Sequence, residues 1–238
     1  MPRQRPTGNL SPSLKPKRKQ ARTAGQRAGV SRNDVLGAAG AIVERQGLEQ
    51  VTMRRLAADL GVAPNALYTY FDNKTALLDA LVDAALATVV VPDVERGSWK
   101  GGLGALMRAS RRTLLAHPHL VPLVIARPGG PSAMRLGEST LRLLACGGVT
   151  GARAAESLRA LLAFTFGFVA LEVPRAADPE GPKRLELAAR TMSALPLDQF
   201  PTTRATAAYL ARHPGDADFE AGLGWLIEGI GRRAASTR

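Results

Sequence analysis

The chain has 238 residues, of which 45% are hydrophobic and 22% charged, so it can bury one or two cores, and wholesale disorder is excluded. No stretch approaches the ~18 uninterrupted apolar residues of a membrane span, and no apolar run follows the basic N-terminus as in a secretory signal. The single cysteine, Cys146, excludes an internal disulfide framework and a cysteine-cluster metal site, and it fits a reducing, cytoplasmic setting.

The net charge of +12 is concentrated at the N-terminus. Residues 1–30 contain eight of the 32 Lys and Arg residues, four prolines and no acidic residue. Because almost nothing apolar lies among them, this tail cannot offset the entropy of ordering and is predicted to be disordered. Two interpretations remain open: a basic arm that adds phosphate contacts on nucleic acid, or a leader without a binding role.

Helix-start and helix-stop residues divide the next segment. Ser31, with Asp34 in capping-box position, predicts a helix that ends at Gly47. Thr52 and Gly61 then bound a second, short helix.

Helical patterns continue to the end of the chain. A third helix begins at Pro64, which suits a first helical position, and Asp72 or Asn73 caps a fourth that reaches Val91. Further helices are predicted over residues 99–116, 132–145, 152–172, 185–194 and 216–233. Convincing strand alternation is absent, so the predicted fold class is all-α.

Residues 52–70 have the layout of a helix-turn-helix. Gly61 supplies the left-handed conformation that ends the first helix sharply, and Ala57 is small enough for close helix approach. The outward positions of the second helix are then expected to be Asn65, Ala66, Thr69 and Tyr70, with Tyr68 near the edge. Spacing alone leaves an ordinary helical hairpin as the alternative.

The residue identities favour the helix-turn-helix. From Leu56 to Leu78 the sequence contains L-A-x-x-L-G-V, L-Y-x-x-F and N-K-x-x-L-L, and it closely resembles the DNA-binding domain of the tetracycline-repressor (TetR) family. A weaker resemblance to the C-terminal domain of the tetracycline-repressor subgroup follows from His117 and Arg127-Pro128, from Phe164 to Val169 and from Phe219 to Leu223. The resemblance implies an all-α homodimer whose N-terminal domains read a palindrome and whose larger C-terminal domains dimerise and hold an effector.

On this basis three regions are expected: the tail (1–30), a helix-turn-helix domain (31–76) and an effector-binding and dimerisation domain (77–238). The resemblance also implies a set of DNA-contacting residues on the two short helices and at the start of the fourth. They are Arg54, Pro64, Asn65, Ala66, Tyr68, Thr69, Tyr70 and Lys74.

The C-terminal region is expected to hold a mainly apolar pocket. The residues proposed to line it are Leu106, Leu120, Leu123, Val124, Arg127, Phe164, Thr165 and Phe168, with Arg127 or Thr165 orienting the ligand. The subgroup places a metal-binding His shortly before its Arg-Pro, but here Leu123–Ala126 contain none, so neither a metal nor a cofactor is expected. In the last helix, Gly222 and Gly229 favour a close helix–helix contact, within one subunit or between two.

These features predict a sequence-specific transcriptional regulator, a repressor released from a palindromic operator by a small, mainly apolar effector. The expected partners are double-stranded DNA, the effector and a second copy of the chain, with no membrane. An enzyme is the second reading, but no G-x-S-x-G, P-loop or H-E-x-x-H motif is present. A structural DNA-binding protein without an effector is the third.

Overall fold

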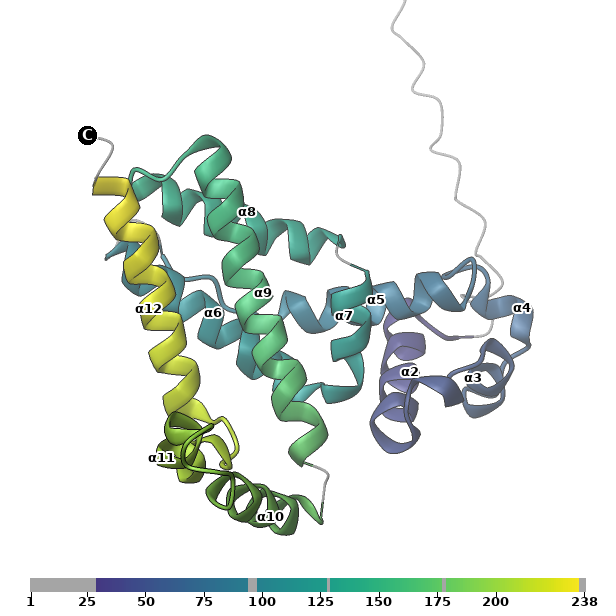
Figure 1. The fold of residues 1–238 in the computed structure, drawn as a ribbon. Helices are drawn as coiled ribbons and strands as arrows, with labels where there is room; N and C mark the ends of the chain where they lie inside the picture. The colour runs from purple at the N-terminus through teal and green to yellow at the C-terminus, as the bar shows by residue number, and fades with distance from the viewer. Residues whose placement is uncertain (1–28, 94–97, 128, 177–178, 236–238) are drawn as a thin grey trace, which may run out of the picture.

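The computed structural model describes residues 29–93, 98–127, 129–176 and 179–235, and every regular element within these ranges is helical. The all-α fold class is therefore confirmed. In chain order the helices are α2 Arg32–Gln46, η1 Leu48–Gln50, α3 Met53–Asp59, α4 Pro64–Leu67, α5 Lys74–Ala87, α6 Trp99–Ala116, η2 Pro118–Leu120, α7 Val121–Ala126, α8 Pro131–Cys146, α9 Gly151–Ala176, α10 Gly181–Ser193, α11 Pro201–Leu210 and α12 Asp216–Ala235. Figure 1 shows α2–α4 as a small group at one end, joined by α5 to a larger bundle.

The predicted start and stop residues of the N-terminal helices are confirmed. Ser31 caps α2 in a complete capping box with Asp34, and Thr52 caps α3 by accepting from the backbone amide of the third helical residue. Asn73, one of the two candidates, caps α5. Gly61 has a φ of +64°, the left-handed conformation that the turn requires.

Several helix bounds and two short helices differ from the sequence-based expectation. Helix α5 ends at Ala87 rather than Val91, because three successive valines and Pro92 follow Thr88 and disfavour further helix. The six-residue α7 and the ten-residue α11 were not predicted, since neither is long enough to give a clear periodic pattern. The tail predicted to be disordered is residues 1–30, of which residues 1–28 lie outside the described residues.

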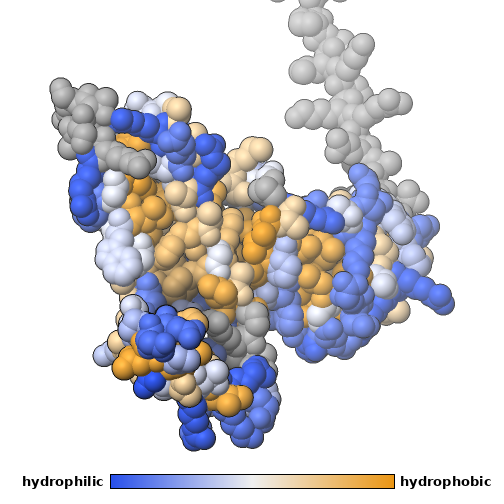
Figure 2. Space-filling model, viewed as in Figure 1, coloured by the Kyte–Doolittle hydropathy of each residue, from blue (hydrophilic) through white to orange (hydrophobic). Residues whose placement is uncertain are grey.

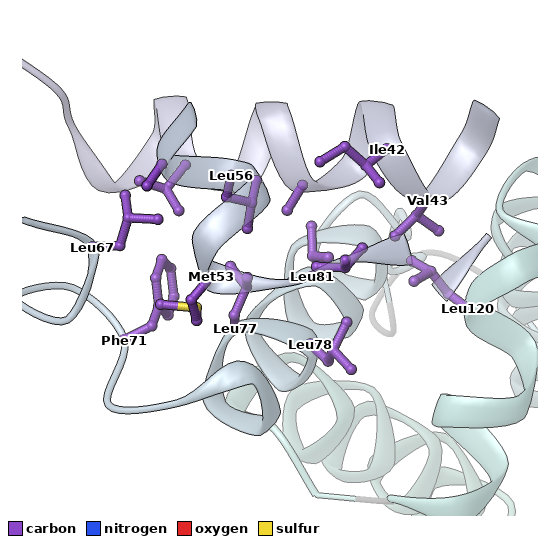
Figure 3. Close-up of a cluster of buried hydrophobic side chains, with 14 residues drawn as sticks. Ile42, Val43, Met53, Leu56, Leu67, Phe71, Leu77, Leu78, Leu81 and Leu120 are labelled. Carbon is purple, nitrogen blue, oxygen red and sulfur yellow. The ribbon is translucent and has the colours of Figure 1, made fainter. Parts of the chain in front are cut away.

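The small N-terminal group has its own core, and it includes residues from the larger bundle. Side chains of α2, α3, α4 and the first half of α5 surround the fully buried Leu56, Leu67 and Leu77. Leu120, from the end of η2, is buried in the same cluster and lies beside Val43 of α2 (Figure 3). The two parts of the chain therefore share packed side chains rather than a solvated linker.

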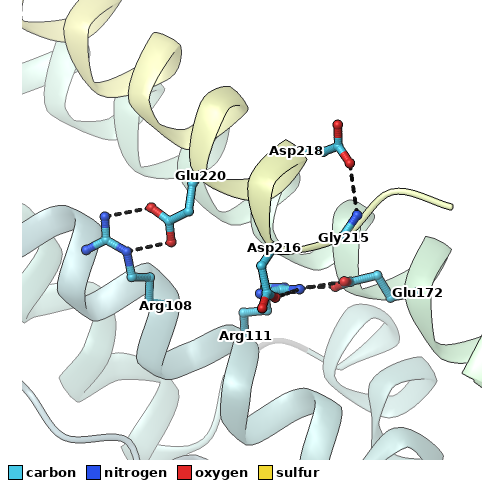
Figure 4. A network of polar contacts seen from close by, with 7 residues as sticks. All are labelled: Arg108, Arg111, Glu172, Gly215, Asp216, Asp218 and Glu220. Atoms are coloured by element: carbon cyan, nitrogen blue, oxygen red, sulfur yellow. Dashed lines mark hydrogen bonds and ion pairs between the residues drawn. The ribbon is translucent and has the colours of Figure 1, made fainter. Parts of the chain in front are cut away.

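The larger bundle combines an aromatic core with a polar network across α6, α9 and α12 (Figure 4). Arg111 donates from Nε to Glu172 at 2.8 Å and also pairs with Asp216 at 2.8 Å, while its guanidinium lies 4.7 Å from the Phe219 ring centroid. The Glu172 hydrogen bonds raise the pKa of Arg111 further above its ordinary range. Arg111 therefore stays charged although only 8% of the residue is exposed.

A second forked pair lies nearby and predicts acid sensitivity. Arg108 donates twice to Glu220, at 2.7 Å each, and these hydrogen bonds hold the pKa of Glu220 below its ordinary value of 4.5. A lowered carboxyl pKa contributes stability that is present above the unfolded pKa and is lost as the pH falls through the folded one. We expect the free energy of unfolding to decrease below about pH 5, as measured by urea denaturation between pH 7 and pH 3.

The matched control for this prediction is Glu220→Gln, which keeps the side-chain shape and removes the titration. This variant should be less stable than the wild type at pH 7 and should lose less stability on acidification. An identical acid slope in both proteins would show that the Arg108–Glu220 pair does not contribute to it.

Helix α9 is long, apolar and only partly covered. Its segment Gly151–Val173 is long and apolar enough, by length and composition, to cross a membrane, although it contains no uninterrupted apolar run of that length. The helix packs against α6, α7, α8 and α12, yet only 22% of its most apolar window is buried. Figure 2 shows apolar residues gathered over α9 and beside α12 on the viewed face.

The glycines of α12 divide between two sides of the helix. A Cβ on Gly222 would stand 2.7 Å from the ring of Phe164, so this glycine permits close packing within the subunit. Gly224 and Gly229 have nothing within 4 Å of a Cβ and are exposed, and Trp225 beside them is 77% exposed. The predicted close contact at Gly222 is thus internal, whereas Gly229 faces away from the subunit.

Candidate nucleic-acid interface and cavity

Helices α3 and α4 form the predicted helix-turn-helix layout. The turn between them is closed by backbone hydrogen bonds from Gly61 to Ala58 and from Val62 to Ala57, and Pro64 occupies the start of α4. Regular α-helix lasts only to Leu67 and is followed by turns through Tyr70.

Most of the predicted DNA-contacting side chains lie on the surface of this motif. Five of the eight are exposed: Arg54, Pro64, Asn65, Tyr68 and Thr69. Tyr68 is 50% exposed although it is a large aromatic residue, so half of its surface is not packed within the subunit. Lys74 is half-buried at the first position of α5.

Two predicted outward positions require correction. Ala66 is buried at 4% exposure, because its methyl group lies on the inner side of the short α4, so it is not available for a contact with a thymine methyl group. Tyr70 packs against the N-terminal core, and its hydroxyl donates to the carbonyl of Val30 at 2.6 Å. Its hydroxyl hydrogen is therefore used in an intramolecular hydrogen bond that fixes the backbone just before α2.

A cavity of about 270 Å³ lies in the larger bundle, between α5, α6, α7, α8 and α9. Most of its wall is apolar, and its polar side chains are Asp83, Ser110, Arg127 and Thr140. The lining residues are Val82, Asp83, Leu86, Met107, Ser110, Val124, Arg127, Gly129, Gly130, Ala133, Met134, Leu136, Gly137, Thr140, Leu158, Leu162 and Phe166.

Only two of the eight residues predicted to line a pocket, Val124 and Arg127, lie on this wall. The other six belong to packed cores: Leu106, Leu120, Leu123, Phe164, Thr165 and Phe168. Sequence reasoning missed Asp83, Ser110, Thr140 and Phe166. The signal that could have found Asp83 is its position one turn after Asp79, a second carboxylate on the same side of an otherwise apolar helix.

The side of α9 that carries Phe164 and Phe168 faces α12 rather than the cavity. Phe164, Phe168 and Phe219 pack with ring centroids 5.3–5.7 Å apart. Phe166 lies between the first two in sequence and so projects to another side of the helix, where it lines the cavity. The buried Thr165 contacts the Met107 sulfur, which is 3.4 Å from its hydroxyl oxygen.

No group of three His, Cys, Asp or Glu side chains in the described residues is arranged to hold a metal ion. His117 lies 3.3 Å from Glu44 of α2, which places it between the two parts of the chain.

Three contacts connect the cavity region to the helix-turn-helix. Leu120 is buried in the N-terminal core. Leu123 packs against that core and also against the buried cluster that includes Val82, Leu86 and Val124. Arg127, which lines the cavity, pairs with Asp79 of α5 at 3.2 Å. Helix α5 also carries buried residues of the N-terminal core, so the cavity wall and the helix-turn-helix core share this helix.

Comparisons with known proteins identify the family. Residues 35–81 match the family described as bacterial regulatory proteins, tetR family, and residues 91–234 match the tetracyclin repressor-like C-terminal domain. The chain belongs to the TetR family. It is therefore a sequence-specific DNA-binding transcriptional regulator, and the predicted resemblance is confirmed.

Individual relatives cover nearly the whole TetR-family fold. The tetracycline repressor protein class A from transposon 1721 of Escherichia coli is 34% identical over 209 residues, which are 87% of this chain and 93% of that protein. The Streptomyces coelicolor TetR family protein ActR, solved in complex with actinorhodin, is 30% identical with a TM-score of 0.79 over 84% of this chain and 95% of that one. BioQ, solved with its double-stranded DNA operator, is 25% identical with a TM-score of 0.60 over 85% and 99%.

Proposed function

We propose that this TetR-family chain is a homodimeric repressor that binds a palindromic operator and leaves it when a small, mainly apolar molecule occupies the cavity. The observation that carries the proposal is that Leu123 packs both against the helix-turn-helix core and against the cluster that contains the cavity residues Val82, Leu86 and Val124. Solved relatives support both halves, since BioQ has been seen with its operator and ActR with actinorhodin.

The operator is read, in this proposal, by the exposed surface of α3 and α4. Asn65 and Tyr68 lie on the short recognition helix and its end, where polar side chains can reach base edges in the major groove. Arg54 and Lys74 flank them and are suited to phosphate contacts, which set position on the duplex rather than sequence preference.

A second copy of the chain covers the α9–α12 face in this proposal. Five exposed residues follow one another at helical spacing along α9: Glu156, Arg159, Ala163, Gly167 and Leu171. Small residues at Ala163 and Gly167, together with Gly224 and Gly229 on α12, allow helices of two subunits to approach closely. Burial of Trp225 and Leu171 against the partner gives apolar stabilisation that the isolated subunit lacks.

The ligand acts, in this proposal, by favouring one of two arrangements of α5 relative to the bundle. A ligand shifts such an equilibrium only if it binds the DNA-released arrangement more tightly. Val82 and Leu86 of α5 line the cavity, so occupancy contacts the element that carries the helix-turn-helix. The competing function, a structural DNA-binding protein without an effector, gives no role to a cavity of this size and composition.

We expect Tyr68→Ala to weaken operator binding by about 10- to 100-fold, because a good base contact contributes ~1–3 kcal/mol. Arg54→Ala should weaken binding less selectively and flatten the salt dependence by ~0.9 in log–log slope if it removes one phosphate contact. Fluorescence anisotropy with the DNA upstream of the protein's own gene, compared with a shuffled duplex, measures both effects.

Arg142→Ala is the matched control, because Arg142 is an exposed arginine on α8, outside the helix-turn-helix. It should bind the operator as the wild type does. Wild-type affinity in both Tyr68→Ala and Arg54→Ala would contradict the assigned surface.

A further inference from the structure

The two charged side chains of the cavity, Asp83 and Arg127, lie where α5 meets the loop between α7 and α8. Two carboxylates one turn apart on α5 contact residues on either side of this loop. Asp79 accepts from Nη1 of Arg127 at 3.2 Å, and Asp83 accepts from the backbone amide of Ser132 at 2.7 Å. The loop residues Gly129 and Gly130 form the adjoining part of the cavity wall.

The Asp83–Ser132 and Asp79–Arg127 contacts differ in how easily a ligand could replace one of the partners. Asp83 sits so close to the loop that a Cβ on Gly130 would stand 2.6 Å from its Oδ1, and its contact with Ser132 is partly buried. The Asp79 and Arg127 side chains are 52% and 40% exposed and meet through a single long contact. Exposed ion pairs contribute little to stability, so Arg127 can leave Asp79 at small cost.

Arg127 has donors to spare. Only Nη1 makes a hydrogen bond with the described part of the chain, whereas a guanidinium has five N–H groups arranged to grip an oxygen anion with two of them. The cavity also contains two hydroxyl groups, those of Ser110 and Thr140. Each donates its hydrogen to a backbone carbonyl at 2.9 Å, that of Leu106 and of Leu136 respectively. The lone pairs of both hydroxyl oxygens therefore remain available to accept from a ligand hydroxyl.

We propose that the effector is a mainly apolar molecule that carries an anionic oxygen group and uses it to take Arg127 from Asp79. The inference rests on the proposed function, because it assigns the chemistry of the same effector site. Once Arg127 turns to the ligand, Asp79 faces a like charge instead of a partner, and α5 loses one of its two attachments to the loop. The backbone contact of Asp83 keeps the loop in place during the exchange.

Two probes that differ only by an anionic group test this proposal. 1-Anilinonaphthalene-8-sulfonate and N-phenyl-1-naphthylamine share the same aromatic body, and only the first carries a sulfonate. By fluorescence titration of the full chain, the sulfonate should bind wild type about tenfold more tightly than the neutral probe, the factor expected for one charge-assisted hydrogen bond. Arg127→Gln should abolish that preference, and Asp79→Asn should increase it by removing the internal competitor.

Two further variants keep the test specific to the cavity. Arg112→Gln removes an equal charge from an exposed position of α6 and should leave the preference unchanged. Gly137→Phe should weaken both probes, because Gly137 lines the cavity and a Cβ there meets nothing within 4 Å.

Equal preference in wild type and Arg127→Gln, or tighter binding of the neutral probe to wild type, would overturn the proposal. Failure of both probes to bind protein that still binds its operator would overturn it as well, while leaving DNA recognition standing. Arg127-dependent binding that does not release operator DNA would support the ligand chemistry and remove effector release from the proposed function.

Discussion

Replacing Arg111 by alanine should lower the free energy of unfolding by about 3–5 kcal/mol, the usual cost of removing one partner of a buried ion pair. The Arg111 and Glu172 side chains are 10% and 12% exposed, so the variant would leave the Glu172 carboxylate desolvated and without its forked partner. It would also remove the cation above the Phe219 ring. Urea denaturation at pH 7, at one fixed protein concentration because the proposed dimerisation would add to stability, measures the loss.

The Arg108–Glu220 pair is a built-in control for this argument. It has the same forked geometry and also joins α6 to a neighbouring helix, here α12 rather than α9, but both side chains are 44% exposed. Arg108→Ala should therefore cost only about 0–1 kcal/mol. Equal losses in the two variants would show that burial does not determine the contribution of these pairs. In the double variant Arg111→Met with Glu172→Leu, most of the lost stability should return, because no buried unpaired charge remains: Asp216, the other partner of Arg111, is 89% exposed.

Introducing a carboxylate at Gly167 should separate the proposed dimer and weaken operator binding by about 100-fold or more, because each monomer would then hold a single half-site. Gly167 is exposed on α9, and a Cβ there meets nothing within 4 Å, so Gly167→Glu should not disturb the fold of the subunit. In a dimer the new charge would be placed in a closely packed helix–helix contact without a partner. Sedimentation velocity gives the oligomeric state, and anisotropy gives the affinity for the operator.

Ala145→Glu on α8 is the matched control, since Ala145 is an exposed helical position outside the α9–α12 face. This variant should sediment and bind DNA as the wild type does. If Gly167→Glu sediments like the wild type, the second copy does not cover this part of α9. If it becomes monomeric yet keeps full operator affinity, the palindromic, two-subunit mode of recognition is wrong.

The sequence was most informative where structure is local. The helix starts at Ser31, Thr52 and Asn73 and the left-handed turn at Gly61 depend on hydrogen bonds and backbone preferences within three or four residues. The same holds for α6, whose bounds at Trp99 and Ala116 agree with the predicted residues 99–116. Short helices such as α7 escaped prediction because six residues do not complete two turns of a periodic pattern.

Local rules were less reliable for the direction of individual side chains. Ala66 and Tyr70 were expected to face outward, but α4 ends after one turn and the chain then bends, which carries Tyr70 onto the core. Phe164 and Phe168 were assigned to a pocket on the strength of their shared side of α9. That side packs against α12, from more than fifty residues further along the chain, and the single Phe166 faces the cavity.

The sequence by itself therefore determined the fold class, the helix-turn-helix and the family, because capping residues, turn glycines and a dense motif are encoded in consecutive positions. Only the tertiary structure decided which residues meet at the cavity and how the cavity is joined to the DNA-binding core. Leu120 illustrates the difference. An apolar side chain suits both a ligand pocket and a contact with the N-terminal core, and the residues next to Leu120 in sequence do not distinguish the two. It lies in the N-terminal core because η2 brings it against α2, some eighty residues earlier in the chain, where burial of its side chain ties the two parts together.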